Sequence, residues 1–173
     1  EPGQFILTGS NQPALGEAIS QSLAGRTSIH HLLPLSLEEL ASANLLVRRD
    51  EMLVKGFLPR LHGAAMSPGD LYSSYFATYV ERDVRRLINV KDITKFETFI
   101  RLLAGRVGQL VNLSSLAGDV GVSSTTLGGW LSALEAAFVV FRLHPHHTNL
   151  GKRLVKTPKL YFTEPGLLTW LLQ

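Results

Sequence analysis

The stretch NLSSLAGDVGVSSTTLGGWLSALEAAFVVFRL, residues 112–143, decides the fold of the second half of this chain. Residues 114–120 predict a short helix, Gly121 a turn, and Ser123 the N-cap of a second helix. The apolar run at 138–143 predicts a strand, and 159–162 predicts its partner across a loop. A helix-turn-helix followed by a hairpin is a winged helix. The second predicted helix carries an apolar face made of Leu127, Trp130, Leu131 and Leu134.

Helical patterns flank this stretch on both sides. Ser67-Pro68-Gly69-Asp70 combines a serine cap, a proline at the first position and a carboxylate in the first turn, which predicts a helix start. Thr94 with Glu97 predicts the start of the next helix, and Glu164-Pro165-Gly166 that of a final apolar helix. We therefore expect residues 67–173 to form a helical and winged-helix domain. The core face predicted for the helix after Thr94 is Phe96, Phe99, Ile100, Leu103, Val107 and Leu110.

The first 40 residues have a different pattern. Residues 5–7 and 29–33 are short apolar runs typical of buried strands, and a helical pattern lies between them from Leu15 to Leu23. Ser36 and Glu39 form a capping box for a further short helix. Buried parallel strands need more strands beside them and helices on both faces, which residues 1–40 are too short to supply. We expect residues 1–40 to be the end of a larger α/β core, and residues 41–66 to be an irregular connector.

Composition excludes several classes of protein. The chain has 173 residues, a formal net charge of +3 and 45% hydrophobic residues, which is typical of a soluble globular protein. No run approaches 18 consecutive apolar residues, so a membrane span is not predicted. The absence of cysteine excludes disulfides and thiolate metal sites and fits a cytoplasmic protein. Three histidines in the loop after 143 lie too close along the chain to converge on one ion, and we predict no metal site.

Six stretches in this order resemble the AAA-type ATPases of bacteria and archaea that carry a C-terminal domain of unknown function. The stretches are FILTGSNQ (5–12), SLAGR (22–26), LLPLSLEEL (32–40), YVERDVRRL (79–87), SSLAGDVGVSSTTLGGWLSALE (114–135) and KRLVKTPKLYFTEPGL (152–167). The resemblance implies an α+β, mostly helical fold: the end of a P-loop α/β core, then a winged helix-turn-helix domain. It also implies that the Walker A and Walker B motifs precede Glu1, and that a nuclease-like segment follows Gln173.

The resemblance gives the longer parent protein ATP and Mg²⁺ as cofactors, but no phosphate-binding motif G-x-x-x-x-G-K-[ST] occurs in this chain. We therefore expect the chain alone to bind no nucleotide and to be catalytically inactive. A polar residue at a strand tip and an arginine near the γ-phosphate are the family's sensors. The polar residue could equally be a helix N-cap, and the arginines on 79–87 could equally form solvated ion pairs. The sensor candidates of the parent are Ser10, Asn11, Arg26, Arg82, Arg85 and the neighbouring Arg86.

The basic residues of the winged helix lie in its wing. Residues 112–137 contain no lysine or arginine, so reading of the DNA major groove by the second helix is not expected. Five positive charges lie in the hairpin without an intervening acid, which suits sequence-independent contact with phosphates. A solvated hairpin, or a surface that meets another domain of the parent, explains them equally well. The candidate nucleic-acid-binding residues are Arg142, Lys152, Arg153, Lys156 and Lys159.

Three hypotheses for the function follow from the sequence. In the first, the winged helix of an AAA-type ATPase couples nucleotide state to a partner or a neighbouring subunit. In the second, the chain is a nucleic-acid-binding module that acts through its basic wing. In the third, it is a protein-interaction domain. The partners expected are the rest of the parent chain or another subunit. Apolar surface on residues 1–40 predicts self-association, disorder, or docking of these residues on the winged helix.

Overall fold

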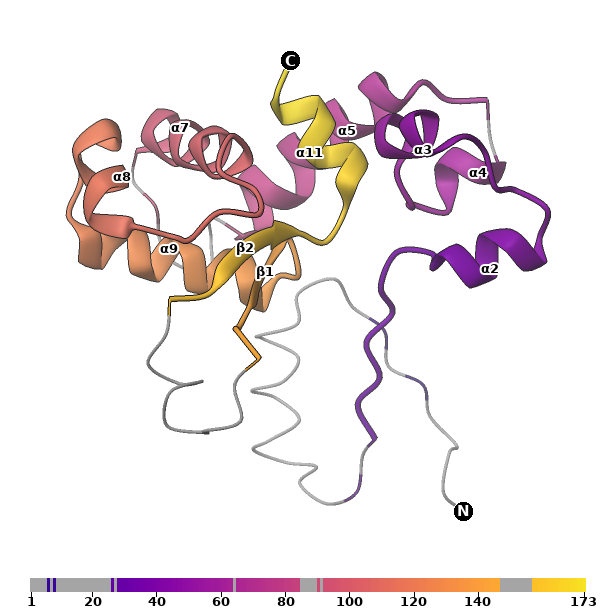
Figure 1. Ribbon diagram of the computed structural model, residues 1–173, viewed down its shortest axis with the longest axis horizontal. Helices are drawn as coiled ribbons and strands as arrows, with labels where there is room; N and C mark the ends of the chain where they lie inside the picture. The colour runs from indigo at the N-terminus through magenta and orange to yellow at the C-terminus, as the bar shows by residue number, and fades with distance from the viewer. Residues whose placement is uncertain are drawn as a thin grey trace. The chain divides into compact units, whose positions relative to one another are not determined.

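The computed structural model describes residues 28–63, 65–84, 92–146 and 157–173, together with Ile6, Thr8, Arg26 and Val90. The chain divides into two compact units, residues 1–32 and 33–173, and each is described by itself. The described part of the second unit is α+β and mostly helical, as predicted (Figure 1). Its elements are α2 (Leu37–Ser42), α3 (Arg49–Lys55), α4 (Arg60–Gly63), α5 (Pro68–Tyr75), the π-helix η1 (Phe76–Val84), α7 (Ile93–Ala104), α8 (Leu113–Val120), α9 (Ser124–Ala136), β1 (Val140–Leu143), β2 (Lys159–Phe162) and α11 (Pro165–Leu171).

The buried strand predicted at 29–33 does not form. Residues 28–33 have no regular secondary structure, and the Leu32 side chain is 99% exposed. Ile6, in the other predicted strand, is 88% exposed. A parallel strand is stable only between neighbours that satisfy its backbone groups, and the one sheet of the described residues is formed by β1 and β2. The helix predicted from Leu15 to Leu23 lies outside the described residues.

Polar side chains start most helices where the sequence predicted them. Ser36 and Glu39 form a reciprocal capping box on α2, and the Ser67 and Ser123 hydroxyls accept from the third backbone N–H of α5 and α9. The start of α7 is different, because Asp92 and not Thr94 is its cap and accepts from Lys95 N at 3.0 Å. An aspartate carboxylate is a stronger cap acceptor than a threonine hydroxyl, which explains the earlier start.

Two predictions of local structure are wrong. Residues 41–66, predicted as an irregular connector, contain α3 and α4, whose short apolar faces bury Met52 and Leu61. The helix after Thr94 ends at Ala104, so Val107 is only half-buried and Leu110 is 61% exposed. A turn at Gly105 and a positive φ at Gly108 redirect the chain there, which a helical spacing rule does not detect.

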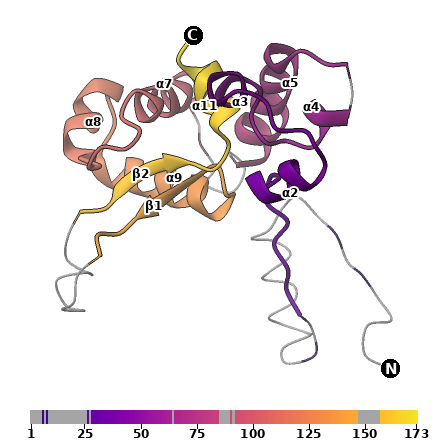
Figure 2. The ribbon, with the colours of Figure 1, turned by 45° about the vertical axis from the view of Figure 1, so that its right-hand side comes forward.

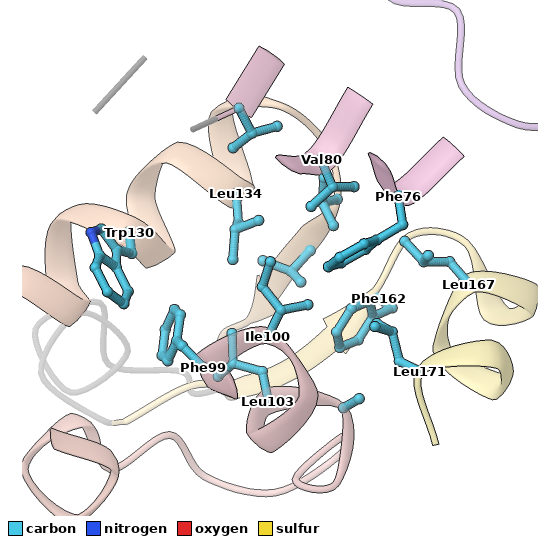
Figure 3. Packing of buried hydrophobic residues seen from close by; sticks show 14 of the residues in the cluster. Phe76, Val80, Phe99, Ile100, Leu103, Trp130, Leu134, Phe162, Leu167 and Leu171 are labelled. Carbon is cyan, nitrogen blue, oxygen red and sulfur yellow. The ribbon is translucent and has the colours of Figure 1, made fainter. Parts of the chain in front are cut away.

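One hydrophobic core joins the helices from α4 to α11 with the sheet. Figure 3 shows Ile100 and Phe162 in the middle of this cluster, with Leu167 on one side and Trp130 on the other. The Trp130 ring meets Phe96 edge-on, with 5.4 Å between ring centroids, a geometry that aromatic pairs prefer. The core therefore ties the last helix of the chain to helices more than 60 residues earlier.

The sheet has two named strands and a third segment beside them. β1 and β2 are antiparallel, with Phe141 opposite Tyr161 and Leu143 opposite Lys159. Residues 108–111 run along the other edge of β2, where Gly108 N donates to Leu160 O at 2.7 Å and Leu160 N donates to Gln109 O at 3.2 Å. Figure 2 shows the hairpin lying along α9.

None of the helices in the described part of the chain is long and apolar enough to cross a membrane.

Candidate functional site: a buried carboxylate

Glu164 is the one charged side chain that is buried among the described residues, and only 4% of it is exposed. It lies between β2 and α11 and caps the helix, because its Oε1 accepts from Gly166 N at 3.0 Å. A buried carboxylate needs a partner for each oxygen to offset the loss of water. The position of Glu164 therefore defines a polar site inside an otherwise apolar interface.

The other partners of this carboxylate come from residues about 100 positions earlier. Phe57 N donates to Oε1 at 2.9 Å and to Oε2 at 3.1 Å. The Tyr72 hydroxyl lies 3.0 Å from Oε1 and 2.9 Å from Lys55 O. One hydroxyl hydrogen serves one acceptor at a time. A proton on Glu164 that is donated to the tyrosine oxygen would satisfy both contacts.

Two glycines allow this close approach. Gly56 has φ +73°, and a Cβ built there would collide with Glu164 Oε1 and the Tyr72 hydroxyl. A Cβ on Gly166 would collide with the Tyr72 ring. Glycine is required at both positions because the tyrosine and the carboxylate occupy the space that a side chain would need.

Burial raises the pKa of Glu164 above its usual range, and hydrogen bonds from Phe57, Gly166 and Tyr72 only partly oppose this, as does the nearby His62. Burial also raises the pKa of Tyr72, with a further contribution from the Glu164 charge. The His62 Nε2 lies 2.9 Å from Gly56 O, and its Nδ1 is buried without a partner in the described part of the structure. Burial therefore makes ionisation of the Glu164 carboxyl less favourable than it is in water.

This shift predicts a pH dependence of stability. The folded chain holds the Glu164 proton more tightly than the unfolded chain, in which the carboxyl has its ordinary pKa of about 4.5. The stabilisation is complete below that pH and is lost as pH rises through the folded pKa, at up to about 1.4 kcal/mol per pH unit. Urea unfolding of the wild type and of Glu164→Gln from pH 4.5 to 8 measures it. The advantage of the wild type should shrink as pH rises, and a constant difference would contradict the assignment.

The carboxylate is part of a longer chain of backbone contacts. Leu35 N donates to Phe57 O at 2.9 Å, while Phe57 N donates to Glu164. One peptide segment at Phe57 thus connects the residues before α2 to the start of α11. Thr169 Oγ1 adds a contact to Leu53 O at 2.8 Å. We define Leu35, Phe57, Tyr72 and Glu164 as the entrance relay.

Most of the sensor candidates cannot be placed, so their role stays a prediction. Ser10, Asn11, Arg85 and Arg86 lie outside the described residues. Arg26 lies in an exposed turn of the first unit, and Arg82 lies on η1, where its side chain is not described. The described residues include no glycine-rich phosphate loop.

The wing candidates are described only in part. The Arg142 Nε donates to Glu135 Oε1 at 2.7 Å, so its charge is balanced by α9. Lys159 is exposed at the start of β2. Lys152, Arg153 and Lys156 lie outside the described residues.

Sequence reasoning used Glu164 only as a helix start and missed its burial. A signal was available, because TEPGLL places one acid between a strand and an apolar helix, both of which predict burial. The contributions of Phe57 and Tyr72 had no such signal, since hydrogen bonds across 107 and 92 residues follow from packing.

A family model described as a domain of unknown function, DUF8612, matches residues 47–173. The chain belongs to this family. A second model, described as an AAA domain, matches residues 1–41. The entrance relay therefore joins the DUF8612 domain to the stretch that matches the AAA domain, since Leu35 lies in that stretch and Phe57 and Glu164 lie in the DUF8612 domain.

Among curated proteins, the chain is similar to an uncharacterized protein of Mycobacterium tuberculosis and one of Mycobacterium bovis. Each is 33% identical over 174 aligned positions, which cover 99% of this chain and 38% of the relative. An uncharacterized protein of Haemophilus influenzae is 28% identical over 172 positions, covering 91% of this chain and 43% of that protein. The chain thus spans about two fifths of the length of these relatives. None of the solved structures gives a significant match.

Proposed function

We propose that this chain is part of a longer AAA-type ATPase, in which the DUF8612 domain couples nucleotide state to a partner or a neighbouring subunit. The observation that carries the proposal is the entrance relay. A rearrangement of the AAA domain that moved Leu35 would pull on Phe57, and through it on Glu164 and α11. Such a two-state coupling needs a contiguous contact between the two parts, which the relay supplies.

The winged-helix interpretation supports a partner-facing role for the same domain. What supports a winged helix is the element order α7, residues 108–111, α8, α9, β1, β2, with Gly121 in the left-handed conformation between α8 and α9. Lys95 Nζ of α7 donates to Gly121 O, and Arg106, in the turn after α7, pairs with Asp119 of α8 at 2.9 Å, so α8 is tied to α7 and to the turn that follows it. The nucleotide pocket would be built by residues outside this chain. We expect this chain by itself to hydrolyse no ATP.

Hydrogen–deuterium exchange on the intact protein tests the coupling. A non-hydrolysable ATP analogue should change exchange by about threefold or more in peptides that contain Leu35, Phe57 and Gly166, because these amides form or flank the relay. The same analogue should have no effect on this chain alone. A response confined to the AAA domain of the intact protein would refute the proposal.

A second candidate function is nucleic-acid binding through the wing. The observation that favours it is the charge of residues 136–163, which include five lysines and arginines and no acid. Because Arg142 is paired with Glu135, four of these charges would contribute, and the salt dependence of duplex binding should correspond to about four phosphate contacts.

A further inference from the structure

The outer face of the sheet carries side chains that the core does not use. In an antiparallel pair, directly opposed residues share a face, and alternate residues along a strand point to opposite faces. Phe141 opposite Tyr161 and Leu143 opposite Lys159 therefore share one face, and Leu110, which bridges to Lys159, joins them. We call these five residues the outer sheet face. The alternate positions Val140, Leu160 and Phe162 are buried on the inner face.

The outer sheet face is exposed and largely apolar. Phe141 is 45% exposed, Leu143 53% and Leu110 61%. Large apolar residues gathered on one face of a sheet usually mark a binding surface, since a solvated face would carry polar residues at these positions. In the described part of the chain, no element covers this face.

Aromatic rings on this face are already stacked. The rings of Phe141 and Tyr161 are 19° from parallel, with 5.6 Å between their centroids. The Tyr161 ring lies beside Gly108, where a Cβ would come within 3.9 Å of it. The stack is supported at Tyr161 and open at Phe141. A planar ligand can extend it there, and every nucleobase has such a π-face.

The charge of the same strands is positive. Residues 136–163 contain no acid, and Arg142 points away from the outer sheet face towards Glu135 on α9. Lys159 lies on the outer face and forms no ion pair with a described residue. In the sequence, the loop between the two strands contains three more basic residues, Lys152, Arg153 and Lys156. Aromatic rings on the same face as Lys159, in a stretch of sequence without an acid, suit a polyanion that carries planar groups.

We propose that the outer sheet face binds single-stranded nucleic acid, with bases stacking on Phe141 and Tyr161 and the backbone near Lys159. A duplex hides the faces of its bases and is read by groove-filling helices, but residues 112–137 offer no lysine or arginine. The inference builds on the second candidate function, because the same hairpin carries it, but it assigns a different surface and a different ligand. It requires no nucleotide hydrolysis.

The test is fluorescence anisotropy of a labelled oligothymidylate of about 12 nucleotides, and of a duplex of equal length, with the whole 173-residue chain. At about 50 mM salt the chain should bind the single strand more tightly than the duplex. Phe141→Ala should weaken single-strand binding about tenfold. Phe141→Tyr should bind like the wild type, because stacking needs only the ring. Lys159→Gln should weaken it about twofold and lower the salt dependence by about one phosphate contact.

A matched control is Leu53→Ala, which removes a side chain that is 47% exposed on α3, far in sequence from the sheet. It should leave binding unchanged, and circular dichroism should show the same folded content for all variants. The inference would be overturned if Phe141→Ala left binding unchanged and duplex binding were lost only when Lys152, Arg153 and Lys156 were changed together to glutamine. That result would still support the second candidate function. The inference would also be overturned if the wild type bound no single strand and light scattering showed a wild-type dimer that Phe141→Ala dissociates. The outer sheet face would then bind a second copy of the chain.

Discussion

Glu164→Ala is expected to lower the free energy of unfolding by about 3–4 kcal/mol near pH 5. The change leaves Phe57 N without its buried acceptor, at about 1–3 kcal/mol for an unsatisfied buried group, and it removes the contact to the Tyr72 oxygen, whose hydroxyl can still donate to Lys55 O. It also removes the N-cap of α11, at about 1 kcal/mol. Urea unfolding followed by tryptophan fluorescence measures the effect, since Trp130 and Trp170 both pack on the same core.

The matched control is Glu135→Ala. Glu135 also accepts hydrogen bonds, from Arg142 seven residues later in the chain, but both side chains of this pair are partly exposed. An ion pair at the surface contributes about 0–1 kcal/mol, so the control should unfold at nearly the wild-type urea concentration. Equal losses in the two variants would show that Glu164 is stabilised no better than a surface carboxylate. That result would remove the physical basis of the entrance relay.

A stable relay has a consequence for coupling. If the hydrogen bonds to Glu164 stabilise the position of Phe57, a displacement of the residues before α2 would either break these bonds or be passed on to α11, as the proposed coupling requires. Arg101 extends the path, because its guanidinium donates to Leu171 O at 3.1 Å and lies 5.5 Å from the centre of the Trp170 ring. The last helix is thus fixed at both ends, at its start by Glu164 and at its end by α7. A helix held in this way moves as a rigid body rather than fraying.

Much of the fold could be predicted because its causes are local. Helices start at Ser36, Ser67 and Ser123 through contacts within three residues. The two strands of the hairpin follow from their apolar runs. The strand predicted at 29–33 fails for the opposite reason. The stability of a parallel strand depends on neighbouring strands, and the described residues do not supply them. A local apolar pattern alone therefore does not form a strand there.

The sites were harder to predict than the fold. The sequence identified the basic hairpin, but it could not show that Arg142 faces α9 and Glu135, because a register shift of one residue would have turned it to the other face. The burial of Leu110 was predicted from helical spacing, and the turn at 105–108 instead placed it on the outer sheet face. The position of each of these side chains is decided by strand pairing, which joins residues distant in sequence.

Gly166→Ala and Gly129→Ala are expected to change stability in opposite directions. Both glycines lie in helices, α11 and α9, where alanine has the better intrinsic propensity by about 1 kcal/mol. A Cβ on Gly129 meets nothing within 4 Å, so Gly129→Ala should stabilise the chain by about 0.5–1 kcal/mol. A Cβ on Gly166 would collide with the ring and hydroxyl of Tyr72, a fully buried side chain that cannot move aside without breaking its contacts to Lys55 O and Glu164.

Gly166→Ala should therefore destabilise the chain by about 2–3 kcal/mol, since the strain of an overpacked core exceeds the gain in propensity. Thermal unfolding of the two variants beside the wild type measures both signs in one experiment. The double variant Gly166→Ala with Tyr72→Phe separates the effect of the ring from that of the hydroxyl. It keeps the collision with the ring, so it should recover little of the stability that Gly166→Ala loses. Full recovery would mean that the hydroxyl alone requires the glycine, and a stabilised Gly166→Ala would mean that Tyr72 does not occupy the space beside α11 in which it holds Glu164.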